Sequence, residues 1–180
     1  MNIVLLILLI LATISILIFC AFFVFPWFFG APYDVSRKPA LKNIVKLTNP
    51  KKGDKIAELG SGDGRVCVAL AGKNKYAEIH GYEINPFLVL ISRYKIKKMN
   101  LQNRVKIYWK NFWNVNLKNF NKIVFFQFST ITEKLENKFE NELKKGTKII
   151  SHNWKLPTWK IKKQLGRDHL SYGIVYLYEK

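Results

Sequence analysis

Hydrophobic residues are concentrated at the beginning of the chain. From residue 3 to residue 29 there is no charged side chain, and only Thr13, Ser15 and Pro26 interrupt the apolar run. At about 1.5 Å per residue, a helix of this length exceeds the ~30 Å hydrocarbon core of a bilayer. The pattern predicts a transmembrane anchor over residues 1–29, which contacts the lipid bilayer through residues 3–29.

A cleaved signal peptide is the competing interpretation of this segment. It is disfavoured because the residues before the apolar run carry no positive side chain and no small-residue cleavage motif ends the run. Basic residues follow the segment and none precedes it, the first four being Arg37, Lys38, Lys42 and Lys46. By the positive-inside rule, we expect a single-pass membrane protein whose globular part lies in the cytoplasm.

Residues 30–54 are predicted to be a linker that contains one short helix, over 39–47. Beyond them, short apolar runs alternate with amphipathic stretches. Strands are predicted at 55–59, 78–83, 105–109, 123–128 and 147–151, and helices at 65–71, 86–99 and 133–143. Two further strands, 161–165 and 173–179, surround a loop at 166–171. The alternation predicts an α/β fold over residues 55–180, with a mostly parallel sheet and an antiparallel C-terminal hairpin.

The chain is strongly basic, with 30 Lys and Arg against 12 Asp and Glu and a net charge of +18. Residues 84–132 contain nine basic side chains and no acidic one, a stretch that nucleic acid could use. Only five of the 30 are Arg, the side chain best suited to bidentate contacts with bases and phosphates, so a nucleic-acid partner is disfavoured. The two cysteines, Cys20 and Cys67, provide no disulfide framework, and no zinc-site spacing is present.

The most informative motif lies between the first predicted strand and the helix that follows it. It spans residues 58–65 and has the sequence E-L-G-S-G-D-G-R. Glycines at this point allow a tight turn and let a ligand approach the backbone at the carboxyl end of a strand. Glu83 ends the second predicted strand, where a carboxylate can accept hydrogen bonds from ribose hydroxyls. Together these features indicate a nucleoside-binding site rather than a glycine-rich turn without a ligand.

The spacing of the motif decides between two nucleoside ligands. Dinucleotide sites use G-x-G-x-x-G and place a pyrophosphate at a helix N-terminus. Here the pattern is G-x-G-x-G, and it is accompanied by two carboxylates, Glu58 and Asp63. Negative charge at these positions would repel a pyrophosphate but suits a ligand that carries a sulfonium and an ammonium. We therefore expect S-adenosylmethionine (AdoMet) as the cofactor.

At this level the sequence resembles class I AdoMet-dependent methyltransferases. It is most similar to the small membrane-anchored protein-lysine methyltransferases, the family that includes the ATP-synthase c-subunit lysine methyltransferase and prokaryotic relatives. The matching segments are A-P-Y (31–33), residues 58–65, G-Y-E-I-N-P-F-L-V (81–89), K-N-F-W (110–113) and L-P-T-W (156–159). The resemblance implies a Rossmann-like methyltransferase domain with no metal, preceded by a hydrophobic segment.

The resemblance also implies how the cofactor is held. Glu58 and the backbone of residues 60–64 would bind the methionine end, Glu83 the ribose diol, and Ile84 would lie against adenine. Asn111 stands where the family usually has Asp, and its amide oxygen could still accept from the adenine amino group. Phe112 packs either on the ring or in the core. The full set of expected cofactor residues is Glu58, Gly60, Ser61, Gly62, Asp63, Gly64, Glu83, Ile84, Asn111 and Phe112.

Methyl transfer to lysine needs alignment with the donor and a neutral amine, which a desolvating aromatic channel would favour. The candidates for this channel are Tyr33, Phe128, Ser129 and Trp159, although each could be structural. The N-P-P-[YF] motif of adenine and amide methyltransferases is absent. The sequence thus predicts methylation of a lysine in a membrane protein, close to the bilayer. The alternatives are a nucleic-acid or lipid-like acceptor, and a catalytically silent AdoMet-binding module.

Overall fold

The computed structural model describes residues 2–20, 34–166 and 173–180. The chain divides into two compact units, residues 1–33 and residues 34–180. The first contains helix α1 (Ile3–Phe19), which Asn2 caps by accepting a hydrogen bond from Val4 N and whose side chains are all exposed. Among the described residues, no helix combines the length and apolar character needed to cross a membrane. Residues 21–29 of the predicted anchor, and Tyr33, lie outside the described residues.

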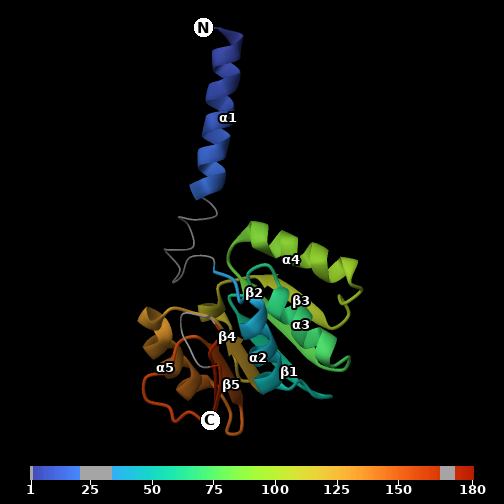
Figure 1. Cartoon of the computed structure of the whole chain (residues 1–180), viewed down its shortest axis with the longest axis vertical. Helices are drawn as coiled ribbons and strands as arrows, with labels where there is room; N and C mark the ends of the chain where they lie inside the picture. The colour runs from blue at the N-terminus through green and yellow to red at the C-terminus, as the bar shows by residue number, and fades with distance from the viewer. Residues whose placement is uncertain (1, 21–33, 167–172) are drawn as a thin grey trace. The chain divides into compact units, whose positions relative to one another are not determined.

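The second unit is built on one seven-stranded sheet (Figure 1). Its strands are β1 (Lys55–Leu59), β2 (Glu78–Glu83), β3 (Val105–Trp109), β4 (Lys122–Phe125), β5 (Lys148–His152), β6 (Lys163–Leu165) and β7 (Val175–Glu179). The order is β3-β2-β1-β4-β5-β7-β6. Strands β1 to β5 pair in parallel, and β7 pairs antiparallel with both β5 and β6. The predicted parallel sheet with an antiparallel C-terminal hairpin is therefore confirmed.

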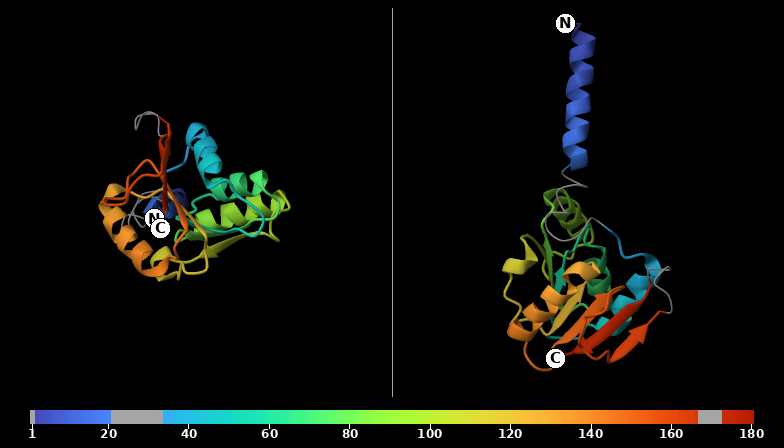
Figure 2. Two further views of the ribbon diagram at one scale, coloured as in Figure 1. Left: turned by 90° about the horizontal axis from the view of Figure 1, so that it is seen from below. Right: turned by 90° about the vertical axis from the view of Figure 1, so that its left-hand side faces the viewer.

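Helices cover both faces of the sheet (Figure 2). One face carries α2 (Lys38–Thr48), α3 (Arg65–Lys73) and α4 (Pro86–Lys98), and the other carries α5 (Thr132–Glu142). Local chemistry sets where α4 begins: Asn85 caps it by accepting from Phe87 N and Leu88 N, and Pro86 occupies its first position. Helix α2, predicted within the 30–54 segment, packs against α3, β5 and β7 and so forms part of this unit.

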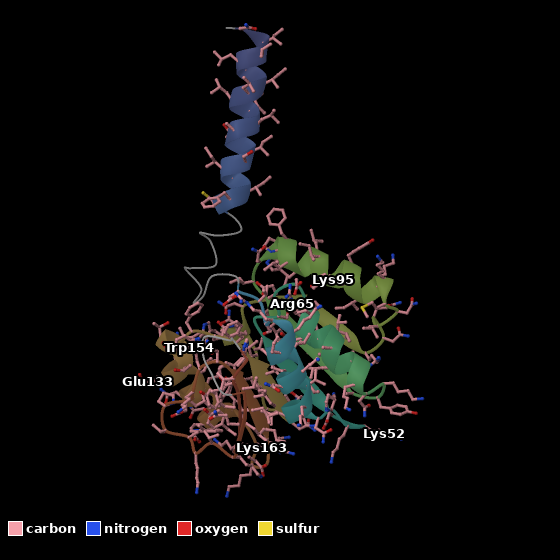
Figure 3. The ribbon with its side chains drawn as sticks, viewed as in Figure 1. Lys52, Arg65, Lys95, Glu133, Trp154 and Lys163 are labelled. Carbon is pink, nitrogen blue, oxygen red and sulfur yellow. The ribbon has the colours of Figure 1, made fainter. Side chains whose placement is uncertain are left out.

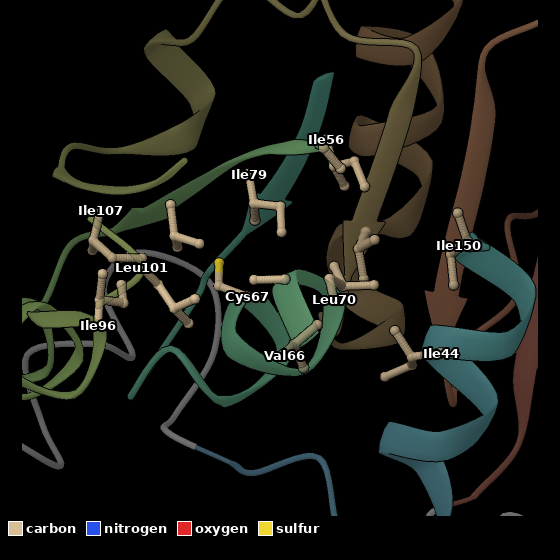
Figure 4. Close-up of a cluster of buried hydrophobic side chains, with 14 of the residues drawn as sticks. Ile44, Ile56, Val66, Cys67, Leu70, Ile79, Ile96, Leu101, Ile107 and Ile150 are labelled. Carbon is tan, nitrogen blue, oxygen red and sulfur yellow. The ribbon is translucent and has the colours of Figure 1, made fainter. Parts of the chain in front are cut away.

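Alternation along the strands creates two cores, one on each face. On β1, Ile56 faces the core under α2, α3 and α4, whereas Ala57 and Leu59 face the core under α5. Figure 4 shows part of the first core, with Cys67 and Leu70 of α3 packed over the sheet. Because β1 is buried on both faces at the centre of the sheet, the residues that follow it are held in a fixed position.

Strand β4 differs from its prediction. It runs from Lys122 to Phe125 and not over 123–128, because Phe125 pairs with Leu59, the residue at which the neighbouring strand β1 ends. Beyond this point Gln127 Nε2 donates to Leu59 O at 3.1 Å. At its other end, the ammonium of Lys122 is buried and pairs with Asp54 at 2.5 Å, so a charged residue can begin a buried strand. Two short 3-10 helices that were not predicted follow β3 and β4: η3 (Phe112–Asn114) and η4 (Ser129–Ile131).

Candidate functional site

The site lies at the carboxyl ends of the parallel strands. From β1 the chain proceeds to β2 and β3 on one side, and it returns to β4 and β5 on the other. The connections on the two sides of β1 therefore diverge, and ligands of open α/β sheets bind beyond the carboxyl end of the strand at such a point. Residues 60–64, here called the glycine loop, occupy this position.

The backbone of the glycine loop adopts conformations that favour glycine. Gly60, Gly62 and Gly64 have φ values of +78°, +53° and +76°. The N–H groups of Gly60 and Ser61 both donate to Tyr82 O at 2.9 Å, which fastens the loop to the end of β2. A β-carbon at Gly60 would collide with Gln127 Nε2, so the loop also packs closely against the segment after β4.

Glu83 joins the glycine loop to the start of α4. Its Oε2 accepts from Gly62 N at 2.8 Å, and its Oε1 accepts from Ile84 N and Asn85 N at 2.9 and 2.8 Å. Burial raises the pKa of this carboxyl, and the three hydrogen bonds oppose the rise. The carboxylate that is predicted to bind ribose is thus preorganised by the backbone, with 8% of its surface exposed.

Glu58, the last acidic residue before the glycine loop, is buried beneath it. The Cys67 thiol donates to Glu58 Oε2 at 2.8 Å. Burial raises the pKa of Glu58 from its usual 4.5 to about 8, and the thiol only partly offsets the rise. A cation that reached this carboxyl would favour its ionised form.

Asp63 is paired with basic side chains, and its assignment to the cofactor stays a prediction. Its carboxylate accepts from Arg65 Nε and Nη2, each at 2.9 Å, and from Lys95 Nζ at 2.5 Å. Figure 3 shows Arg65 and Lys95 near each other. The pKa of Asp63 falls to about 2 because these hydrogen bonds and charges outweigh desolvation by burial. Its charge is neutralised within the protein, so Asp63 ties the loop to α4 and supplies no free negative charge to a ligand.

The hydroxyl of Ser61 is packed inside the site. Its Oγ is buried, and among the described residues it is the one buried side-chain oxygen or nitrogen without a hydrogen-bond partner. It lies toward β2, where a β-carbon at Gly81 would stand 2.8 Å from it, so it is not presented to a ligand. The glycine conformations of the loop and the placement of Glu83 fit the predicted nucleoside cofactor.

The expected adenine contacts lie at the ends of β2 and β3. Ile84 is half-buried directly after Glu83. Asn111 Oδ1 accepts from Trp113 N at 3.0 Å and caps η3, which uses one lone pair of its amide oxygen and leaves the other. Phe112 is buried in the core under α5, with its ring 4.8 Å from that of Trp113. The assignment of these three residues to adenine stays a prediction.

The candidate channel residues do not all come together. Phe128 and Ser129 follow the carboxyl end of β4, before α5 begins. Trp159 instead lies near the far end of α5, where its ring is 6.0 Å from Lys180 Nζ, which pairs with Glu140. Trp159 therefore does not join Phe128 and Ser129, because the segment after β5 runs alongside α5, where Thr158 N and Oγ1 donate to Glu136.

A different tryptophan takes that place. Trp154, two residues after β5, has its ring centroid 6.2 Å from that of Phe128. Trp154 could have been predicted as a channel residue from the sequence, because it comes just after a buried strand. The ends of β5 and β4 meet at the same edge of the sheet. Ser36 lies at the same edge, with its Oγ 3.1 Å from Nδ1 of the buried His152. We call the carboxyl ends of β4 and β5, with Phe128 and Trp154, the acceptor edge.

The described part of the site contains no group of side chains arranged to bind a metal ion. Among the described residues, no group of three or more His, Cys, Asp or Glu side chains could hold a metal ion. His80 lies under Tyr108 and Phe120 on β2, with ring centroids 5.6 and 5.4 Å away, and its pKa is lowered by burial. It is packed against aromatic rings rather than presented to the glycine loop.

Comparison with known proteins gives consistent matches. The profile of the ANTKMT methyltransferase domain matches residues 58–163. The human ATP-synthase c-subunit lysine N-methyltransferase is 31% identical over 71% of this chain and 54% of its own length. A protein-lysine N-methyltransferase of Saccharolobus islandicus is 27% identical over 82% of this chain and 92% of its own. The chain spans about half the length of the human relative.

Among solved structures, an RNA methyltransferase from Salinibacter ruber in complex with S-adenosyl-L-homocysteine has the same fold. It aligns with a TM-score of 0.75 at 22% identity, over 81% of this chain and 93% of that one. The predicted Rossmann-like methyltransferase fold and the predicted family resemblance are thereby confirmed.

Proposed function

Because the chain belongs to the ANTKMT methyltransferase domain family, we propose that it is an AdoMet-dependent protein-lysine N-methyltransferase. The observation that carries the proposal is the hydrogen bond between Glu83 and the glycine loop at the carboxyl end of β1. The names of the human and Saccharolobus relatives support lysine as the acceptor.

Each part of the site has a task in holding the cofactor. The glycine-loop backbone and Glu58 hold its amino-acid end. Glu83 keeps lone pairs for the ribose diol because its three backbone hydrogen bonds use only part of the acceptor capacity of a carboxylate. AdoMet supplies a methyl group on a sulfonium, which an in-line nucleophile displaces.

The protein must deliver the acceptor amine neutral and aligned. A lysine has a pKa of about 10.4 in water, and removal from water lowers it. The aromatic rings of Phe128 and Trp154 at the acceptor edge exclude water beside the methyl donor and are our candidates for this task. No covalent link between enzyme and substrate is needed, so the site requires no protein nucleophile.

We further propose that the protein acts beside a membrane on lysines of membrane proteins. The proposal rests on the uncharged run from residue 3 to residue 29 and on the basic residues that follow it. Within this run, all side chains of α1 are exposed and nearly all are apolar. A single-pass anchor with the catalytic domain on the cytoplasmic side accounts for this pattern.

The acceptor is tested by supplying isolated membranes, soluble protein and RNA with methyl-labelled AdoMet and the purified full chain. We expect label on lysines of membrane proteins, mapped by mass spectrometry, and less label with the Glu83→Ala variant at the same AdoMet concentration. Label confined to RNA, to lipid or to soluble proteins would overturn the acceptor assignment. Absence of AdoMet binding in calorimetry would overturn the enzyme assignment itself.

The anchor is tested separately by fractionation. The full chain should remain with membranes after a carbonate wash, and deletion of residues 2–29 should release a domain that still binds AdoMet. Recovery of the intact full chain in the soluble fraction would contradict the anchor.

A further inference from the structure

The outward surface of α4 is apolar although the helix is not covered by another described element. Its inner face packs on the sheet through Leu88, Val89 and Ile96. On the outer face, Leu90 and Tyr94 are 63% and 67% exposed, and they lie one turn apart. The exposed Ile91 adjoins them. Exposed large side chains scattered singly need no explanation, but a contiguous stripe on one helix does.

An exposed tryptophan stands at the start of the same helix. Trp109, the last residue of β3, has 66% of its surface exposed. Its Nε1 donates to Ile84 O at 2.9 Å, two residues before α4 begins. The indole is therefore held beside the first turn of α4, at the edge that also carries Glu83. We call Leu90, Ile91, Tyr94 and Trp109 the α4 surface.

The charged side chains of α4 itself are all basic. Lys97 and Lys98 are exposed in the last turn of α4. From residue 84 to residue 132, which includes α4 and β3, there are nine basic and no acidic side chains. A partner for this surface must accept apolar side chains and must be anionic. Both properties belong to the interface of a bilayer that contains anionic lipid.

We propose that the α4 surface docks on the interface of an anionic lipid bilayer. Leucine and isoleucine enter the acyl boundary, Tyr94 and Trp109 take the headgroup level that such rings prefer, and the lysines attract acidic headgroups. Docking through α4 brings the edge with Glu83 and the glycine loop close to the bilayer. The contact is separate from the apolar N-terminal run, and it does not depend on which acceptor is methylated.

The test places an environment-sensitive thiol dye on the full chain in lipid vesicles. In a Cys20→Ser background, the remaining native cysteine, Cys67, is buried and hydrogen-bonded to Glu58, so a new cysteine is labelled selectively. The probe position is Leu90→Cys. The matched control is Asn137→Cys, an exposed position on α5 at the other face of the sheet. Both labelled proteins are first checked for unchanged AdoMet affinity.

The vesicles contain phosphatidylcholine with or without phosphatidylserine, and bromine-labelled acyl chains serve as quenchers. We expect several-fold stronger quenching of the dye at position 90 than at position 137, and weaker quenching at position 90 when phosphatidylserine is omitted. Tyr94→Ser should also reduce the quenching at position 90.

Three results would overturn the proposal. Equal quenching at the two positions would mean that α4 stays in water. Blue-shifted emission at position 90 without lipid quenching would mean that protein covers the surface, including this chain's own residues 21–33. Lipid quenching that arises only after a membrane-protein acceptor is added would mean that α4 recognises that protein. None of these readouts uses methyl transfer, so a failure here is distinguishable from a failure of the proposed enzyme activity.

Discussion

The carboxylate of Glu83 and the N–H of Gly62 are joined by a hydrogen bond of 2.8 Å across the ends of β2 and β1. The same carboxylate accepts from Ile84 N and Asn85 N. The residue assigned to ribose therefore also sets the shape of the loop that is assigned to the other end of the cofactor. Ligand binding and the local fold depend on the same side chain. A mutation of Glu83 must therefore be measured both for AdoMet affinity and for the free energy of unfolding.

Glu83→Ala is expected to lower both affinity and stability. Three backbone N–H groups lose their acceptor, and leaving buried donors unpaired costs about 1–3 kcal/mol. We expect the free energy of unfolding to fall by that amount in urea titrations, and the AdoMet dissociation constant to rise roughly tenfold or more. Glu78→Ala, at the exposed start of the same strand, is the control and should change neither quantity appreciably. Wild-type affinity in Glu83→Ala would contradict the ribose assignment.

Gly60→Ala is expected to be destabilising by about 1–2 kcal/mol, because alanine must adopt a φ of +78°. Its β-carbon would also displace Gln127 Nε2, now 3.1 Å from Leu59 O. Gly72→Ala is the matched control: its β-carbon meets nothing within 4 Å in helix α3, so it should stabilise by up to about 1 kcal/mol. Thermal unfolding compares the two, and equal effects would contradict this account of the loop.

Glu58 predicts a pH dependence whose sign is set by its raised pKa. The folded state holds the proton up to about pH 8, whereas the unfolded chain loses it near 4.5. The contribution of this group to stability is thus complete below pH 4.5 and is lost as the pH rises through 8. Each pKa unit corresponds to about 1.4 kcal/mol, so the total effect is several kcal/mol. In urea unfolding experiments, the free energy of unfolding of Glu58→Gln should not show this decrease between pH 4.5 and pH 8.

Cofactor binding should change the protonation of the Glu58 carboxyl. A ligand cation favours the ionised carboxylate, so we expect binding at pH 7 to release a proton from Glu58 and AdoMet affinity to increase as the pH approaches 8. Calorimetry in buffers of different ionisation enthalpy measures the release. Proton release that persists unchanged in Glu58→Gln would show that another group is responsible.

The acceptor edge is tested by comparing two tryptophans. Trp154→Ala should lower the rate of methyl transfer roughly ten- to hundredfold through loss of alignment and of water exclusion, while AdoMet affinity stays the same. Trp159→Ala, near the last turn of α5, should leave kcat/KM close to wild type once the protein is folded. If the order of the two effects is reversed, the channel lies along α5 and our placement is wrong.

Local pattern predicted most of what the structure contains, and long-range contacts account for the rest. Strand β1, the glycine loop and Glu83 follow from periodicity and from turn chemistry, which are properties of neighbouring residues. Asp63 pairs with Arg65, two residues away in the same motif, and with Lys95, 32 residues away, and only the second pairing had no local signal. The end of β4 coincides with the end of its partner β1, because Phe125 pairs with Leu59, a contact between residues far apart in the sequence.

The separation of Trp159 from Phe128 and Ser129 also arises from contacts that a local pattern does not show. Trp159 belongs to the L-P-T-W motif, which supports the family resemblance. The motif does not show near which end of α5 the tryptophan lies. That depends on the path of the segment after β5, which is fixed by contacts such as those between Thr158 and Glu136 on α5.

The central position of β1 has a consequence for the order of folding. β1 pairs with β2 nearby in the sequence, but its contact with the β4 side joins Lys55 to Asn121, 66 residues away. Closing so long a loop is entropically expensive, so the site is completed only after the two halves of the sheet have met. A cofactor that recognises the finished site should therefore slow unfolding and leave the refolding rate nearly unchanged, as a chevron measured with and without AdoMet would reveal.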